Sequence, residues 1–244
     1  MKILVIGESC RDIFNYGVCD RLCPEAPVPV FNPARSIENG GMARNVYNNL
    51  LKFSDVEVNL HTNQNWKDVK KTRFVDFKTN HMFMRLDEND NKFRRSRLKR
   101  IVFRNYDAVI ISDYNKGFIT EKDIEYIASK HENTFLDTKK ILGEWCGNIK
   151  FIKINNYEYE KTKHRISPEI KEKLIITMGP DGCKHNDTDY PVPKVEIKDS
   201  SGAGDTFIAA LTVKFVETSD ISESIIYANK CATEVVQKRG VSTI

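Results

Sequence analysis

The chain has 244 residues, of which 40% are hydrophobic and 30% charged, and its formal net charge is +4. This length predicts one globular domain, residues 1–244, with a large buried core. No apolar run approaches the ~20 residues that a membrane helix needs, and the first residues, MKILVIGES, indicate a buried strand and not a signal peptide. We therefore expect a cytoplasmic location and no membrane partner.

The cysteines and the mild charge narrow the chemistry further. The six cysteines show no C-x-x-C pair and no matching histidine pair, so we expect reduced thiols and no structural zinc. A net charge of +4 fits an enzyme with anionic substrates and does not require a nucleic-acid partner.

Short apolar segments alternate with charged, helix-like stretches along the chain. The predicted strands are residues 2–7, 107–113, 133–138, 150–155 and 173–179. Continuous apolar strands separated by helices, such as the one expected over 120–132, predict an α/β fold with a mostly parallel sheet covered on both faces. Ligands of such sheets bind beyond the carboxyl ends of the strands. The residues expected there are Asp113, Asp137, Asn155 and Thr177.

Two segments interrupt this rhythm. Residues 25–38, which are rich in proline, and residues 70–87 alternate apolar and polar side chains, as strands do. We interpret them as strands of a small separate sheet that forms a lid over the site. The alternative is that they are edge strands of the main sheet.

A basic run follows at residues 92–106. Leu98, Ile101 and Val102 recur at helical spacing, while the cationic residues can share another face, so we expect a solvated amphipathic helix. The alternative is a nucleic-acid patch.

The stretch KDSSGAGDTF, residues 198–207, carries the strongest chemical signal. Gly202, Ala203 and Gly204 let the backbone expose its N–H groups just before a predicted helix, which makes an anion cradle suited to a phosphoryl group. Asp205 stands in the first helical turn, where the helix dipole favours its ionised form, and it can act as a general base for a hydroxyl. The alternative is an ordinary helix start.

Three further features surround this stretch in our interpretation. Ser200 or Ser201 is expected to cap the helix that begins near Ala203. Paired glycines, Gly40 and Gly41, precede Asn45, whose amide can bridge hydroxyls of a polyol, or they mark a helix entry.

Asn155 and Glu158 stand three residues apart after a predicted strand. Their oxygens can organise Mg²⁺ through water, or they form an ordinary helix cap. The chain has neither a G-x-x-x-x-G-K-[ST] loop nor a G-x-G-x-x-G fingerprint after the first strand.

The order of these motifs, GG-x-x-x-N, N-x-x-E, TMGPDG and SGAGDTF, resembles the ribokinase-like (PfkB) carbohydrate kinases over nearly the whole chain. The segments RLCPEAPVPVF, SDYNKG and YANKCATEVVQKRGVSTI are similar to the branch that phosphorylates D-glycero-D-manno-heptose 7-phosphate at its anomeric hydroxyl. The resemblance implies a three-layer fold with a small β lid, ATP and Mg²⁺ as cofactors, a sugar phosphate as substrate, and a homodimer formed through the lid.

The resemblance also implies a role for each matching residue. Asp205 would be the catalytic base and Gly202, Ala203 and Gly204 the anion hole. Asn155 and Glu158 would serve the magnesium and phosphates. The implied nucleotide residues are Thr177, Gly179, Gly182 and Asn229. The implied substrate residues are Asp12, Gly40, Gly41, Asn45, Lys116 and Lys139.

The chain departs from the family pattern in two places. Glu8 stands where the relatives usually carry Asp, and only a short polar linker joins Leu60 to Lys70. Three alternatives to a heptose kinase stay open: a kinase for another sugar or nucleoside, a silent sugar-phosphate-binding protein, and a nucleic-acid binder that uses residues 92–100.

Overall fold

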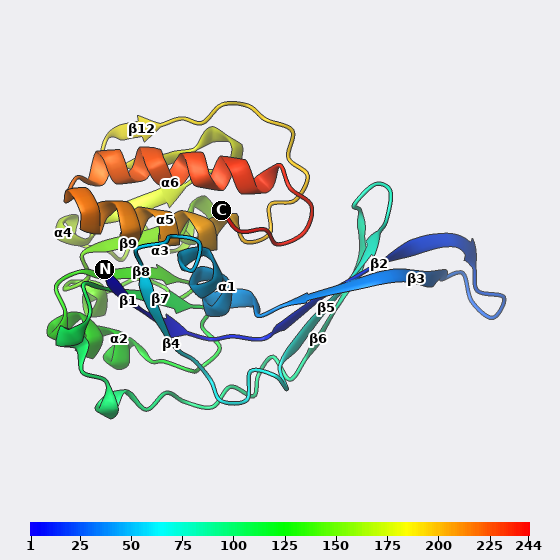
Figure 1. The fold of residues 1–244 in the computed structure, drawn as a ribbon, viewed down its shortest axis with the longest axis horizontal. Coiled ribbons are helices and arrows are strands. Elements are labelled where there is room, and N and C mark those ends of the chain that lie inside the picture. Colours follow the sequence, from blue (N-terminus) through cyan, green and yellow to red (C-terminus); the bar gives the residue numbers. More distant parts are fainter.

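The computed structural model describes all residues from Met1 to Ile244. Its centre is an eight-stranded sheet in the order β12-β11-β10-β9-β8-β7-β1-β4 (Figure 1). The strands are β1 (Lys2–Gly7), β4 (Glu57–His61), β7 (Ala108–Asp113), β8 (Thr134–Thr138), β9 (Phe151–Asn155), β10 (Leu174–Thr177), β11 (Cys183–His185) and β12 (Thr188–Tyr190). In this sheet, neighbouring strands among β4, β1, β7, β8, β9 and β10 pair in parallel. Strand β11 pairs with β10 and with β12 in antiparallel fashion. The five strands predicted from the sequence all form; β4, β11 and β12 were not predicted.

Both faces of this sheet are covered by helices. In β1, Ile3 and Val5 point into one apolar cluster and Leu4 and Ile6 into the other, as strand geometry requires. The first face carries α1 (Gly41–Leu50), α5 (Ala203–Thr218) and α6 (Ile221–Val236). The second carries α2 (Glu121–Lys130), α3 (Asn156–Thr162) and α4 (Pro168–Lys171). The result is the expected three-layer α/β arrangement.

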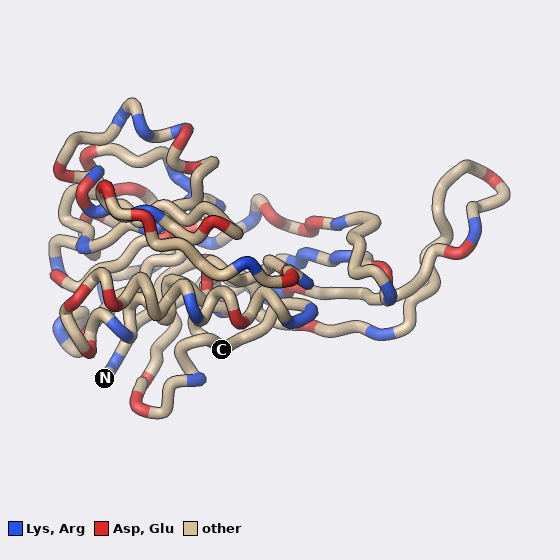
Figure 2. The backbone as a smooth tube through the Cα atoms, turned by 90° about the horizontal axis from the view of Figure 1, so that it is seen from above, with Lys and Arg blue, Asp and Glu red and all other residues tan.

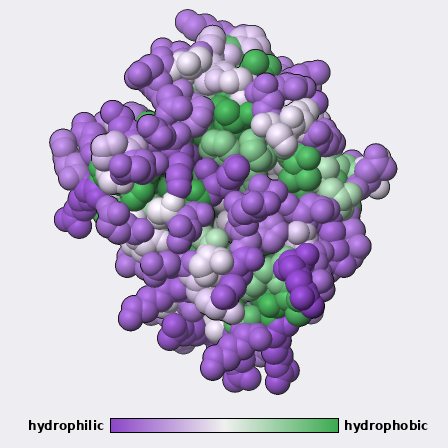
Figure 3. Space-filling model, turned by 90° about the vertical axis from the view of Figure 1, so that its left-hand side faces the viewer, coloured by the Kyte–Doolittle hydropathy of each residue, from purple (hydrophilic) through white to green (hydrophobic).

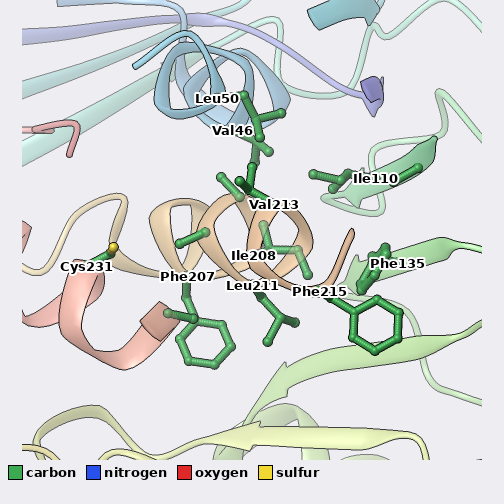
Figure 4. Packing of buried hydrophobic residues seen from close by; sticks show 14 of the residues in the cluster. Val46, Leu50, Ile110, Phe135, Phe207, Ile208, Leu211, Val213, Phe215 and Cys231 are labelled. Carbon is green, nitrogen blue, oxygen red and sulfur yellow. The ribbon is translucent and has the colours of Figure 1, made fainter. Parts of the chain in front are cut away.

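Helix α5 lies at the centre of the first face (Figure 4). Its side chains are buried nearly all round, because α1 and α6 cover the sides that the sheet leaves open. Phe215 meets Phe135 of the sheet edge-on, with ring centroids 5.7 Å apart. This packing holds the amino end of α5 at a defined place beside the carboxyl ends of the strands.

A second, four-stranded sheet extends from the core as an arm (Figures 1 and 2). Its order is β3-β2-β5-β6, with β2 (Arg11–Leu22), β3 (Pro29–Asn39), β5 (Lys70–Asp76) and β6 (Met82–Glu88). We call it the small sheet. The predicted separate sheet is thus confirmed, but β2 was missed and residues 25–28 precede the strand expected there. The buried side of β2 includes Asp12, Phe14 and Tyr16, so it does not show the usual apolar and polar alternation.

The helix expected over residues 92–106 is absent, and that prediction was wrong. Two short 3₁₀ turns, Leu98–Arg100 and Phe103–Asn105, interrupt an otherwise irregular segment. Leu98 and Phe103 are buried in the second apolar cluster, whereas Val102 is 49% exposed. Single apolar residues therefore attach this irregular segment to the core. Their tertiary packing outweighs the helix propensity that the spacing indicated.

The rest of the surface mixes charged, polar and apolar groups. Basic and acidic residues are interspersed over the core (Figure 2). The face opposite to the small sheet is mostly hydrophilic, with separate apolar areas (Figure 3). None of the helices has both the length and the apolar character needed to span a bilayer.

Candidate active site

Two cavities meet at the turn that begins α5. One, of about 510 Å³, is lined by Ala203 and Gly204 and extends toward α6. The other, of about 390 Å³, is lined by Gly202 and Asp205 and extends toward the small sheet. We call them the α6 cavity and the small-sheet cavity. The turn between them is the GAGD stretch that the sequence indicated.

The turn has the properties of an anion site. Gly202 is the N-cap, with φ 84°, so neither Ser200 nor Ser201 caps the helix, and that expectation was wrong. A side chain at this position would be strained, and a Cβ there would lie 2.5 Å from Asn45 Nδ2. The backbone N–H groups of Gly204 and Asp205 have no partner within the protein. They point from a helix start, where the dipole favours an anion.

Asp205 is held by two donors from distant elements. It is 6% exposed. Asn45 Nδ2 donates to its Oδ2 at 2.8 Å, and the Tyr114 hydroxyl donates to its Oδ1 at 3.1 Å. Burial raises the pKa of Asp205 to about 6, although the hydrogen bond from Asn45 opposes this change. The helix dipole favours the ionised form, as expected, but desolvation has the larger effect on the pKa because the carboxylate is buried. The carboxylate still ionises below neutral pH and suits a general base.

A buried ion pair lies beneath the turn. Lys153 Nζ, on β9, is 2.8 Å from Asp137 Oδ2, on β8, and Lys153 is only 4% exposed. A Cβ at Gly204 would lie 2.6 Å from this ammonium group, so the glycine leaves room for it. Lys153 was not predicted as a site residue from the sequence. Its signal was a lysine inside an otherwise apolar strand, KFIKIN.

The small-sheet cavity is rich in cations. Asp12, Gly41, Asn45, Lys116 and Lys139, all singled out from the sequence, line it. Gly40 does not; it is the N-cap of α1, and a Cβ there would meet the side chain of Arg44. Three cations that the sequence analysis missed, Lys71, Arg73 and Arg85, also line the cavity. In all, five Lys or Arg side chains and the two carboxylates of Asp12 and Asp205 surround it.

These cations are positioned by carboxylates around the rim. Arg73 pairs with Asp12, and Lys71 lies 2.9 Å from Asp90, which also pairs with Lys116. Arg85 lies 2.8 Å from Asp87. The pairs orient the cationic groups without filling the cavity, so an anionic group entering it meets preformed donors.

Tyr114 reaches Asp205 because Glu8 shapes the turn after β7. The buried Glu8 carboxylate accepts the N–H of Tyr114 at 2.9 Å and the N–H of Lys116 at 3.0 Å. Asn115, between them, has φ 56°. Burial raises the pKa of Glu8. Glu8 thus holds the turn that carries two cavity-lining side chains.

The α6 cavity contains the residues expected at a nucleotide. Thr177, Gly179, Gly182 and Asn229 line it together with Ala203 and Gly204. Besides Ala203, the apolar residues that line it are Val192, Val195, Ile197, Phe207, Ala232 and Val236. Asn229 Nδ2 donates to the carbonyl of Tyr190 at 2.9 Å, which ties α6 to the loop over the cavity. The mixture of an apolar wall and a glycine-rich phosphate end suits a flat heterocycle with a charged tail.

Asn155 and Glu158 form a capping box at the start of α3. Asn155 Oδ1 accepts the Glu158 N–H at 2.9 Å, and Glu158 Oε2 accepts the Asn155 N–H at 2.8 Å. The other oxygen of Glu158 pairs with Lys139. The structure contains no cluster of three His, Cys, Asp or Glu residues suited to a metal. Asp137 Oδ1, however, is buried without a hydrogen-bond partner. These groups fit a hydrated Mg²⁺ carried mainly by phosphates.

Comparison with known proteins agrees with this geometry. A family model described as pfkB family carbohydrate kinase matches residues 42–244. The chain is 26% identical over 292 aligned positions to the bifunctional protein HldE of Nitratiruptor sp., and 30% identical over 297 positions to that of Aliarcobacter butzleri. Both alignments cover 99% of this chain but only 63% and 62% of the relatives, so the chain spans less than two thirds of their length.

Solved structures support the fold. Ribokinase from Thermotoga maritima superposes with a TM-score of 0.73 at 16% identity, covering 98% of this chain and 94% of the ribokinase. The nucleoside kinase of Methanocaldococcus jannaschii gives a TM-score of 0.68 at 16% identity, covering 98% and 93%. The expected ribokinase-like α/β fold is confirmed.

Proposed function

The chain belongs to the pfkB family of carbohydrate kinases and is a phosphotransferase, and from this premise we propose that it transfers the γ-phosphoryl group of ATP to the anomeric hydroxyl of D-glycero-D-manno-heptose 7-phosphate. One observation carries the proposal: five cationic side chains line the small-sheet cavity that opens onto Asp205. A neutral sugar does not require cationic groups, whereas the phosphate of a sugar phosphate is commonly bound by Lys and Arg side chains. The similarity to the HldE proteins supports the heptose.

In the proposed reaction, ATP occupies the α6 cavity with its γ-phosphate at the turn. The free N–H groups of Gly204 and Asp205 and the ammonium group of Lys153 stabilise the charge on the transferring phosphoryl group. Asp205 accepts the proton of the attacking hydroxyl. Glu158 and Asp137 would hold the water shell of the Mg²⁺ that accompanies ATP, and the ion would neutralise phosphate charge.

The acceptor enters from the side of the small sheet. Its distal phosphate would bind Lys71, Arg73 and Arg85, and its ring hydroxyls would bind Asp12 and Asn45 near Asp205. The cationic groups then decide which phosphorylated sugars bind, and the position of Asp205 decides which hydroxyl reacts.

A screen of phosphorylated sugars for ADP release tests the proposal. We expect heptose 7-phosphate to give the highest kcat/KM, with Mg²⁺ required. If another sugar or a nucleoside is preferred, the proposed acceptor is wrong but the assignment as a kinase stands. Tight binding of the sugar phosphate without ADP release would instead indicate a silent binding protein, and salt-sensitive binding of DNA without ADP release would indicate a nucleic-acid binder.

We also propose a homodimer formed through the small sheet. Its strands and hairpins expose eight large apolar side chains: Leu22, Val28, Ile37, Phe77, Met82, Phe83, Met84 and Leu86. Phe31 packs edge-on against Phe74 and Phe83, so these aromatic side chains of three strands form one cluster on the small sheet. A second copy that covers this apolar surface would remove it from water.

A further inference from the structure

Met42, the second residue of α1, has a backbone conformation that residues with side chains rarely adopt. Its φ is 52° and its ψ is −134°. The other non-glycine residues with positive φ are four asparagines and one serine. Asparagine tolerates positive φ because its short polar side chain bonds locally, but methionine gains nothing of this kind. A conformation of this kind persists only where its surroundings impose it, and such sites gather around function.

Hydrogen bonds on both sides impose the conformation of Met42. The Gly41 N–H donates to Asn39 Oδ1 at 2.8 Å, and the Ala43 N–H donates to the Glu8 carbonyl at 2.9 Å. Glycine at position 41 also has a positive φ of 40°. The chain between β3 and α1 is therefore fixed on either side of Met42, and the strain cannot relax by a shift of its neighbours.

This conformation places the Met42 side chain between the core and the small-sheet cavity. Met42 is 5% exposed and packs in a cluster with Cys10 and Val69, against which Phe93 and Tyr114 also pack. Only four of the 15 residues that line the cavity are apolar, and Met42 is one of them; the others are Cys10, Tyr114 and Val241. Met42 therefore forms part of the small apolar wall in a cavity otherwise made of charged and polar groups.

We propose that Met42 is a specificity-determining residue of the acceptor site. Its side chain limits the size of the cavity and packs against the carbon-bound hydrogens of the acceptor, while the cations bind the phosphate. A glycine at this position would remove the backbone strain, but the cavity would lose the apolar side chain that limits its size. The proposal rests on the proposed function only in taking the small-sheet cavity as the acceptor site.

The strain is tested by thermal melting without any substrate. Met42→Gly and Met42→Ala both lose the side chain beyond Cβ. The difference between their melting temperatures therefore reports the backbone strain at this position. We expect Met42→Gly to melt about 2–4 °C above Met42→Ala. The matched control is Val46, which is buried in the regular part of α1, where glycine should melt below alanine. If Met42→Gly melts at or below Met42→Ala, the position is not strained and the proposal loses its basis.

Acceptor selection is tested with a panel of sugar phosphates, including heptose 7-phosphate, sedoheptulose 7-phosphate and glucose 6-phosphate. For wild type, the ratio of kcat/KM between the best and second-best acceptor is measured. We expect this ratio to fall about tenfold in Met42→Ala and Met42→Gly, the usual effect of an altered apolar pocket. Met42→Leu should keep the ratio within about threefold, because it conserves volume. The KM for ATP should not change in any variant.

The two proposals fail in different ways. If wild type prefers a sugar other than heptose 7-phosphate, the proposed acceptor is wrong, and the ratio still reports on Met42. If wild type releases no ADP with any sugar, the same ratio is taken from dissociation constants measured by calorimetry. An unchanged ratio in Met42→Ala would overturn the assignment of Met42 in either case.

Discussion

The Tyr114 hydroxyl donates a hydrogen bond to Asp205 Oδ1 at 3.1 Å, although the two residues are 91 positions apart in the chain. This bond favours the ionised carboxylate and so lowers the pKa of Asp205, against the larger effect of burial. The acidity of the proposed base is therefore set jointly by the core, which desolvates it, and by the turn after β7.

Tyr114→Phe should shift the pH dependence of the reaction. Asp205 acts as a base only when ionised, so kcat/KM should fall as pH decreases through about 6, the pKa of this carboxylate. Without the hydroxyl the ionised form is less favoured, and the acidic limb should move to higher pH. We expect kcat/KM to decrease about tenfold near pH 6. Initial rates from pH 5 to pH 9 measure this, and an unmoved limb would show that Tyr114 only packs.

Asp205→Asn should reduce kcat by roughly 10²–10⁴-fold and leave ATP binding nearly unchanged. It should also stabilise the fold at neutral pH. The folded-state pKa of Asp205 is raised from 3.8 to about 6, so its contribution to stability is fully present below pH 4 and is lost as pH rises through 6. Ionisation then costs on the order of 3 kcal/mol, and asparagine avoids this cost.

Asparagine also suits the neighbours of this position, since its oxygen can accept from Asn45 and its amide can donate to the Tyr114 oxygen. Chemical denaturation at pH 4 and pH 7.5 is the measurement. A variant that is stabilised equally at both pH values would contradict the raised pKa, and one that retains kcat within threefold would remove Asp205 as the base.

Lys153→Met should decrease kcat by about 10²-fold because the ammonium group beneath Gly204 is lost. It should also destabilise the fold, since Asp137 is left buried and unpaired. The double variant Lys153→Met with Asp137→Asn, compared with Asp137→Asn alone, separates the two effects. We expect it to recover most of the melting temperature but not the turnover; recovery of both would mean that Lys153 serves only the structure.

Lys71→Met should raise the KM for the sugar phosphate about 10–100-fold, because a cation that lines the small-sheet cavity is removed. The KM for ATP should not change. The unphosphorylated sugar provides the control: its low rate should be the same in wild type and variant. Equal losses with both sugars would show that Lys71 does not contact the phosphate.

Phe83→Asp should dissociate the proposed dimer, since Phe83 belongs to the exposed apolar set of the small sheet. The control is Ile226→Asp, at an exposed apolar position on α6, away from the small sheet. Light scattering over a range of protein concentrations should give twice the chain mass for wild type and the control, and the chain mass for Phe83→Asp. A wild type that remains monomeric and active at high concentration would contradict the dimer.

The local sequence determined the main strands of this protein and its glycine-rich turn. The five short apolar strands could be predicted because continuous apolar runs, flanked by charged helical stretches, have few other stable arrangements. The turn formed by the GAGD stretch could also be predicted, because its glycines are close together in the chain and their effect on the backbone is local.

Tertiary structure decided the chemistry that these elements carry. Asn45 and Asp205 are separated by 160 residues, and Lys153 meets Asp137 only because β8 and β9 are neighbours. Asp12 lies beside Lys71 because β2 pairs with β5 in parallel, which no local pattern indicates. The pKa of Asp205 could not be predicted either, since it depends on burial by distant elements. Residue type is a property of the chain, but contact, charge environment and desolvation arise only when remote segments pack together.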